Sequence, residues 1–95
     1  MDEYARQAAL IREQRERLQV ALKGLPGVRP YPSEANMILV RVPDAAALFQ
    51  ALKARNVLVK NVSGLHPLLA NCLRLTVGTP DENTAMIDAL KASLL

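Results

Sequence analysis

Two cations interrupt apolar stretches whose alternation is typical of β-strands. Arg74 lies at the centre of CLRLTV (72–77), where apolar residues alternate with smaller or polar ones. Lys60 interrupts VLVKNV (57–62) in a similar way. A guanidinium fork suits the bidentate binding of a carboxylate or a phosphate. If the two stretches are neighbouring strands, both cations can serve one anion.

The same pattern also fits purely structural roles, and both interpretations stay open from the residues alone. An arginine is unremarkable on the exposed face of an edge strand, and a lysine such as Lys60 can protect a strand edge. Two features favour binding by Arg74. Its neighbours Cys72 and Thr76 are small enough to leave the guanidinium room. Gly78 permits close backbone approach, and the N-terminus of the helix that follows attracts anions.

No complete catalytic or metal-binding arrangement accompanies these cations. His66 is the only histidine, and it lacks a second histidine, a cysteine pair or a carboxylate cluster to complete a metal site. Cys72 is the only cysteine, and we expect a small packing residue in a reducing compartment. The glycines match neither a phosphate-binding loop nor a dinucleotide fingerprint. We therefore expect no catalytic residue and no metal site.

Composition restricts the class of protein further. The 95 residues are 51% hydrophobic and only 3% aromatic, which predicts one small domain with an aliphatic core. No apolar run approaches the roughly 20 residues that span a bilayer, and the N-terminus lacks a signal-peptide pattern. We expect a cytoplasmic protein. The net charge of +3 includes basic residues that alternate with acidic ones at helical spacing, which indicates a solvated helix face rather than a nucleic-acid surface.

Helix and strand signals predict an α+β fold, a two-layer α/β sandwich. The segment 24–36 is rich in proline and glycine and predicts an extended connection. Thr79 and Glu82 form a capping box with Pro80 at the first helical position. Together these signals predict a small, mostly antiparallel sheet with helices packed on it. The elements come in the order α-β-α-β-β-α along the chain. The expected elements are helix 2–23, strand 36–42, helix 45–55, strand 57–62, strand 72–77 and a helix from Pro80. The first helix carries one narrow apolar stripe, Tyr4, Ala8, Ile11, Leu18 and Leu22.

These residues also carry a family resemblance. The segments ANMILVRV (35–42) and LKARNVLVKNVSGLHPLLANCLRLTVGTPDEN (52–83), with the final helix, resemble the C-terminal part of histidinol-phosphate aminotransferases. These are fold-type I, pyridoxal-phosphate-dependent enzymes of histidine biosynthesis. The resemblance covers essentially the whole chain, and CLRLTVGTPDEN is its most specific element. It implies a single small domain over 1–95, in which 1–24 is the long helix of the interdomain type and 25–95 is the core.

The resemblance implies a role for each cation. In the family, the arginine of the CLR segment binds the substrate's acidic end, which is the phosphate of histidinol phosphate, and this position is Arg74. A second cation, often an arginine, contacts the same phosphate. Its position is Lys60, which offers a point charge in place of a planar fork. The cofactor's Schiff-base lysine and phosphate cradle belong to the family's large domain, so Lys23, Lys53 and Lys91 are not expected to hold pyridoxal phosphate.

The resemblance also implies partners and leaves alternatives open. We expect this chain alone to bind no cofactor and to be inactive in transamination between histidinol phosphate and 2-oxoglutarate. Its expected partners are the large pyridoxal-phosphate-binding domain, the substrate and, as is usual in the family, a second subunit, with no nucleic acid and no membrane. One alternative is a free-standing α+β module that binds a small anionic metabolite. Another is the C-terminal domain of a different class I/II amino-acid aminotransferase. An RNA-binding sheet is disfavoured because the expected strands lack stacking aromatics.

Overall fold

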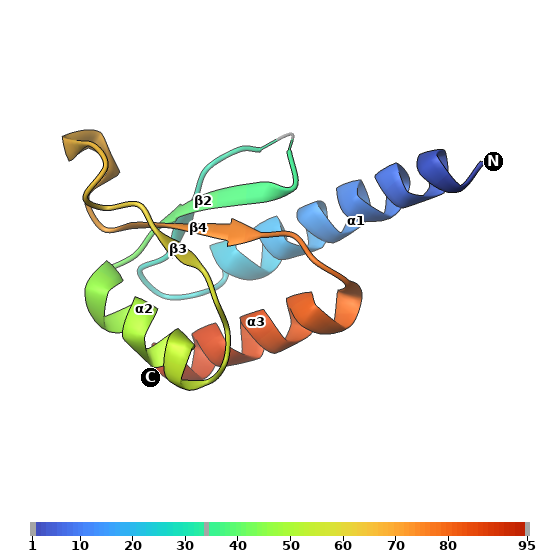
Figure 1. The fold of residues 1–95 in the computed structure, drawn as a ribbon. Coiled ribbons are helices and arrows are strands. Elements are labelled where there is room, and N and C mark those ends of the chain that lie inside the picture. Colours follow the sequence, from blue (N-terminus) through green and yellow to red (C-terminus); the bar gives the residue numbers. More distant parts are fainter. Residues whose placement is uncertain (1, 34, 95) are drawn as a thin grey trace.

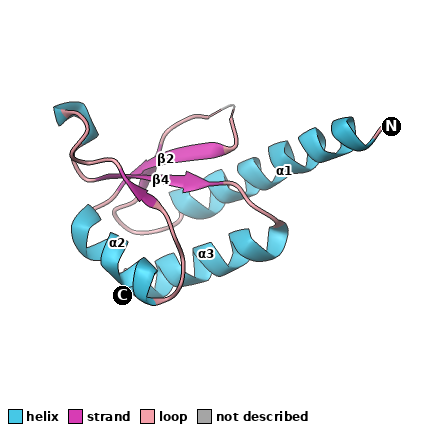
Figure 2. Cartoon of the chain, in the orientation of Figure 1, coloured by secondary structure: helices cyan, strands magenta, loops and turns pink. Residues whose placement is uncertain are grey.

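The computed structural model describes residues 2–33 and 35–94, in which three α-helices pack against a four-stranded sheet (Figure 1; Figure 2). The α+β class and the small antiparallel sheet are confirmed. A 3₁₀ turn, η1 (Pro67–Leu69), lies between the last two strands. The helices and strands are α1 (Glu3–Lys23), β1 (Arg29–Pro30), β2 (Met37–Arg41), α2 (Ala45–Ala54), β3 (Lys60–Asn61), β4 (Cys72–Thr76) and α3 (Pro80–Ser93).

All neighbouring strands of the sheet are antiparallel, in the order β1-β2-β4-β3. The expected antiparallel pairing of the last two strands is confirmed. The segment expected to be only a connection contributes β1, whose Arg29 pairs with Arg41 of β2. The strand expected over 57–62 is shorter, because the chain leaves α2 through Asn56 with a positive φ of 63° and joins the sheet only at Lys60. Val57 and Val59 pack partly buried against the core instead, whereas Leu58 between them is exposed.

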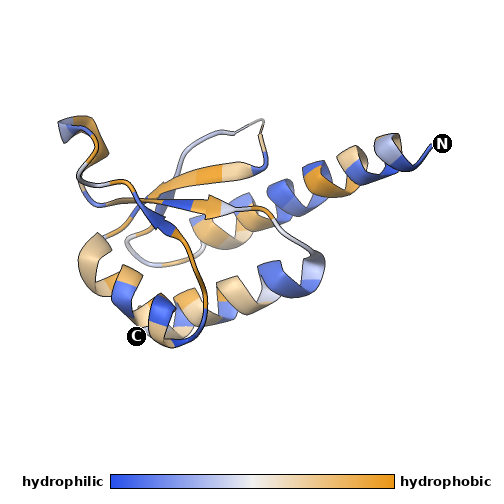
Figure 3. Cartoon of the chain, viewed as in Figure 1, coloured by the Kyte–Doolittle hydropathy of each residue, from blue (hydrophilic) through white to orange (hydrophobic). Residues whose placement is uncertain are grey.

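One face of the sheet is buried against the three helices. Apolar residues of β2 and β4 meet the apolar stripes of the helices there, and the same strands are strongly hydrophobic in Figure 3. Within the described chain, no helix is long and apolar enough to cross a membrane. The largest fully buried apolar side chains of this core are Leu18, Leu22, Ile38, Leu52, Leu73, Leu75, Leu90 and Val40.

Side-chain caps determine where the helices begin. The Asp44 carboxylate accepts a hydrogen bond from the Ala47 amide at 3.1 Å and starts α2. At α3, the Thr79 hydroxyl accepts from the Glu82 amide at 3.2 Å, and the Glu82 carboxylate accepts from the Thr79 amide at 2.9 Å. The predicted capping box is therefore confirmed.

Only the second half of α1 packs against the rest of the fold. The first half projects past the sheet in Figure 1, and no described side chain before Gln14 is buried. Tyr4 is 83% exposed and Ile11 is 37% exposed, whereas Leu18 and Leu22 are fully buried. The predicted apolar stripe therefore exists, but only its C-terminal part contributes to the core.

Candidate anion-binding site

Arg74 and Lys60 lie side by side on the sheet. Arg74 is the middle residue of β4, with Leu39 of β2 opposite it on one side and Lys60 of β3 opposite it on the other. Directly opposed residues of antiparallel strands project from the same face, with Cβ atoms about 5 Å apart. Leu73 and Leu75 point into the core beneath the helices, so Arg74 points to the other face because side chains alternate along a strand. We call this helix-free side the open face (Figure 1).

The two cations form no ion pair with an acidic side chain among residues 2–33 and 35–94. The ion pair found within these residues joins Glu3 to Arg6, far along α1. Arg74 is half-buried and Lys60 is exposed, so both remain accessible to a ligand. Like charges directly opposite each other on a sheet are destabilising. An anion placed between them removes that repulsion, and the arrangement is therefore suited to bind one.

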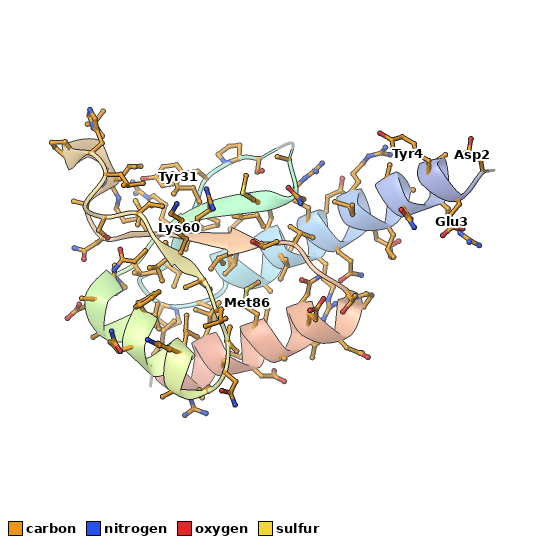
Figure 4. The ribbon with its side chains drawn as sticks, in the orientation of Figure 1. Asp2, Glu3, Tyr4, Tyr31, Lys60 and Met86 are labelled. Carbon is orange, nitrogen blue, oxygen red and sulfur yellow. The ribbon has the colours of Figure 1, made fainter. Side chains whose placement is uncertain are left out.

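Two further side chains on the open face were not singled out from the sequence. The Tyr31 amide donates to the Leu39 carbonyl at 2.9 Å, so the chain continues β1 alongside the row that contains Arg74. The Arg41 guanidinium carbon lies 5.9 Å from the centroid of the Tyr31 ring. Figure 4 shows Tyr31 and Lys60 on the opposite side of the sheet from Met86, which lies toward the helices. The alternation of Arg41 with the apolar residues Val40 and Val42, which are buried, was the available sequence signal.

The Arg41 side chain is partly buried. Its Nη2 donates to the Leu68 carbonyl at 2.6 Å, while its buried Nε finds no hydrogen-bond acceptor among the described residues. The neighbouring Cys72 thiol, and after it the Tyr31 hydroxyl, raises the pKa of the Arg41 guanidinium above its ordinary value. Arg41 is therefore a fixed positive charge.

The N-terminus of α3 does not add to this site as expected. The Gly78 amide donates to Asn83 Oδ1 at 2.8 Å, and the Thr79 amide donates to the Glu82 carboxylate. The hydrogen bond from the Thr79 backbone, followed by that from its side chain, lowers the pKa of Glu82. A Cβ at position 78 would lie 2.7 Å from Glu82 Oε1, so the glycine makes room for this carboxylate. The expectation is wrong because the helix carries its own anion.

Asn83 is a buried polar residue that sequence reasoning missed. It is 1% exposed, and its Nδ2 donates to the Gly78 carbonyl at 3.0 Å and to Gln14 Oε1 at 3.2 Å. Arg17 donates to the same Gln14 oxygen at 2.8 Å and also bonds the Thr84 hydroxyl. This network ties α1 to the turn that follows β4 and so fixes the end of the strand that carries the arginine.

His66 and Cys72 have structural roles in the connection between β3 and β4. His66 caps η1, because its Nδ1 accepts from the Leu68 amide at 3.1 Å. Cys72 is fully buried, with its Sγ 3.7 Å from the Ala70 carbonyl. In the part of the chain that the structure describes, no three His, Cys, Asp or Glu side chains gather as metal ligands.

The lysines of the helices lie apart from the two cations. Lys23, Lys53 and Lys91 are exposed, and each belongs to a helix that packs against the opposite face of the sheet. An anchoring lysine for a covalently bound cofactor is normally desolvated or beside a second cation. These three residues therefore do not fit such a site.

Several curated proteins that are similar to this chain in sequence are named histidinol-phosphate aminotransferase. No protein-family model matches the chain. It is 70% identical over 93 residues to the histidinol-phosphate aminotransferase of Methylibium petroleiphilum, and the match covers 98% of this chain and 25% of that protein. The chain therefore spans about a quarter of the length of the curated relatives it matches.

Solved structures show the same fold. The histidinol-phosphate aminotransferase of Clostridium acetobutylicum matches with a TM-score of 0.84 at 20% identity, over 90% of this chain and 27% of that chain. The L-threonine-O-3-phosphate decarboxylase of Porphyromonas gingivalis matches with a TM-score of 0.77 at 28% identity, over 85% of this chain and 26% of that chain. The same α+β fold thus recurs as about a quarter of longer chains.

Proposed function

We propose that this chain, which is similar to histidinol-phosphate aminotransferases over about a quarter of their length, provides the phosphate-binding half of such an enzyme's substrate site. The reaction is transamination between histidinol phosphate and 2-oxoglutarate in histidine biosynthesis. The observation that carries the proposal is the direct pairing of Lys60 with Arg74 on the open face, without an acidic partner in the described chain.

The two side chains contribute to phosphate binding in different ways. The planar guanidinium of Arg74 donates two parallel hydrogen bonds to two phosphate oxygens, and this fixes the orientation of the group. Lys60 supplies a compact point charge for the remaining negative charge. The open face leaves the rest of the substrate free to extend away from the sheet. The name of the Porphyromonas gingivalis enzyme supports this interpretation, because its substrate also carries a phosphate ester.

The amino-transfer chemistry belongs to the remainder of the enzyme. Pyridoxal phosphate supplies the electron sink for transamination when it is bound. The exposed helix lysines of this chain do not fit that cofactor. We therefore assign this chain the recognition of the substrate's anionic end, and we expect no turnover by the 95-residue chain alone.

The partner surfaces follow from the same proposal. The long helix over 1–24 leads toward the large cofactor-binding domain, while 25–95 is the small-domain core. The projecting half of α1, with Tyr4 and Ile11 exposed, contacts that large domain. A second subunit completes the enzyme as a homodimer. We place the activity in the cytoplasm, since a single free cysteine, Cys72, suits a reducing compartment.

A matched pair of ligands tests the proposed function. The purified chain is titrated with histidinol phosphate and with histidinol, which differ only in the phosphate. We expect binding of the phosphate ester with a dissociation constant on the order of 1 mM, because two solvent-accessible cations supply little more than about 4 kcal/mol, and no measurable binding of histidinol. Equal binding of both ligands would contradict a phosphate site. Tighter binding of L-glutamate would instead assign the cations to a carboxylate.

A further inference from the structure

The position of Lys60 rests on a short strand. β3 contains only Lys60 and Asn61, and it lies at the edge of the sheet, where β4 is its one neighbour. The next contact along the chain is the Val62 amide, which donates to the Cys72 carbonyl at 3.2 Å. Few backbone hydrogen bonds hold such an edge segment, so its position depends on how the connection that follows it is held.

The connection over 62–71 is anchored at Asn71, whose backbone carbonyl and Oδ1 accept hydrogen bonds from the Val42 and Ala45 amides, and its middle is folded mainly on itself. The Ser63 hydroxyl donates to the Cys72 carbonyl at 3.2 Å, and the His66 ring caps the Leu68 amide. Leu65 and Leu68 are 67% and 76% exposed, so their side chains add little packing. The connection protrudes beyond the end of the sheet in Figure 1. Its middle therefore needs support from another element.

Arg41 provides that support from β2. Its Nη2 reaches the Leu68 carbonyl at 2.6 Å across a distance of 27 residues in sequence. The Leu68 backbone is thus held at both of its polar groups, since its amide donates to His66 Nδ1 and its carbonyl accepts from Arg41 Nη2. Tyr31 lies against the guanidinium, and this fixes the direction in which Arg41 extends.

We propose that Arg41 is a positioning residue for the anion site: by holding the Leu68 carbonyl it fixes the 62–71 connection, and through it keeps Lys60 opposite Arg74. The inference rests on the proposed function, because it assumes that Lys60 and Arg74 share one phosphate. The hydrogen bond to Leu68 occupies Nη2 of Arg41. We therefore assign Arg41 an action on the ligand through Lys60, and the experiment below separates this from direct contact.

A double-mutant cycle separates action through Lys60 from direct binding. Arg41→Met is compared with Arg29→Met, which removes an equal charge from the residue paired with Arg41 in register. Inorganic phosphate is the probe. We expect Arg41→Met to weaken phosphate binding about fivefold, as is common for residues that share one network, and Arg29→Met to weaken it less than about twofold. In a Lys60→Ala background, Arg41→Met should cost no more than Arg29→Met.

Two results would overturn the proposal. If Arg41→Met retains its full effect when Lys60 is alanine, Arg41 binds the anion directly. If Arg41→Met and Arg29→Met have equal effects in the wild-type background, Arg41 contributes only its charge. Arg41→Lys should restore most of the affinity, because an ammonium can also donate to the Leu68 carbonyl.

Amide hydrogen exchange tests the same step without any ligand. We expect Arg41→Met to speed exchange at Val62 about tenfold or more, because a freed connection opens locally. Exchange at Leu90 in the core of α3 should not change, which shows that the variant is folded. Unchanged exchange at Val62 would overturn the positioning role. Absence of phosphate binding to the wild-type chain would instead overturn the proposed function, and the exchange result would still decide the role of Arg41.

Discussion

Lys60 and Arg74 are direct cross-strand partners on the open face of the sheet, and no acidic side chain of the described residues pairs with either of them. Two like charges in adjacent positions of a β-ladder cost stability. The helix layer on the other side explains why both project the same way, since Leu73 and Leu75 occupy the core side of β4. The fold thus concentrates positive charge at a place that a phosphate can occupy.

Substitution of Lys60 should change the affinity of the chain for inorganic phosphate. Lys60→Arg should strengthen binding about twofold to fivefold, because it adds a planar fork with parallel donors. Lys60→Ala should weaken binding about tenfold, because one of the two charges is lost. Isothermal titration calorimetry measures both effects. Lys53→Ala, at an exposed position of α2, is the control, and wild-type affinity in Lys60→Ala would exclude Lys60 from the site.

The buried amide of Asn83 should be a major contributor to stability. Asn83→Ala leaves the Gly78 amide and carbonyl and the Gln14 oxygen without this partner. We expect a loss of about 2–3 kcal/mol in the free energy of unfolding, measured with urea. Gln50→Ala on the exposed face of α2 should change it by less than about 0.5 kcal/mol. Equal values for the two variants would mean that the network is not formed.

The capping box of α3 should make stability depend on acid. The folded chain lowers the pKa of Glu82 below its ordinary value of 4.5. A depressed carboxyl pKa contributes stability that is fully present above the ordinary value and is lost as pH falls through the lowered one. Thermal unfolding between about pH 6 and about pH 2 should therefore show a smaller acid dependence in Glu82→Gln than in the wild type. Identical slopes would show that the carboxylate does not cap the helix.

The projecting half of α1 should be dispensable for folding. Deletion of residues 1–12 removes no side chain that is buried in the described structure. We expect the free energy of unfolding to change by about 0.5 kcal/mol or less. A deletion that continues through Leu18 should cost at least about 3 kcal/mol, because it removes a fully buried leucine and the Gln14 contact. A large loss in the free energy of unfolding from the shorter deletion would contradict the proposal that this half of α1 contacts another domain.

Local signals allowed much of the fold to be predicted. The capping box at Thr79 and Glu82 depends on residues three apart, so its presence could be read directly. The alternation around Arg74 reflects the period of a strand and correctly predicted its neighbours Leu73 and Leu75 in the core. Local pattern also placed Lys60 within a strand, although the strand is only two residues long and not the expected six.

Long-range contacts explain what could not be predicted. Asn83 pairs with Gln14, which is 69 residues away, and neither residue differs from an ordinary exposed helix position in the sequence. The same holds for the bond from Arg41 to Leu68. The two residues of β1 were missed because Arg29 and Pro30 lack strand alternation and owe their conformation to pairing with β2. In each case a tertiary partner, and not local preference, determines the outcome.

The central claim is that Arg74 binds the phosphate of the substrate. A two-dimensional amide NMR titration of the chain with histidinol phosphate tests it most directly, with Arg74→Ala as the test variant and Arg12→Ala, on the exposed surface of α1, as the charge-matched control. We expect shifts that cluster at Lys60 and Arg74 in the wild type, persist in Arg12→Ala and disappear in Arg74→Ala. Shifts spread along α1, or an undiminished response in Arg74→Ala, would contradict the claim.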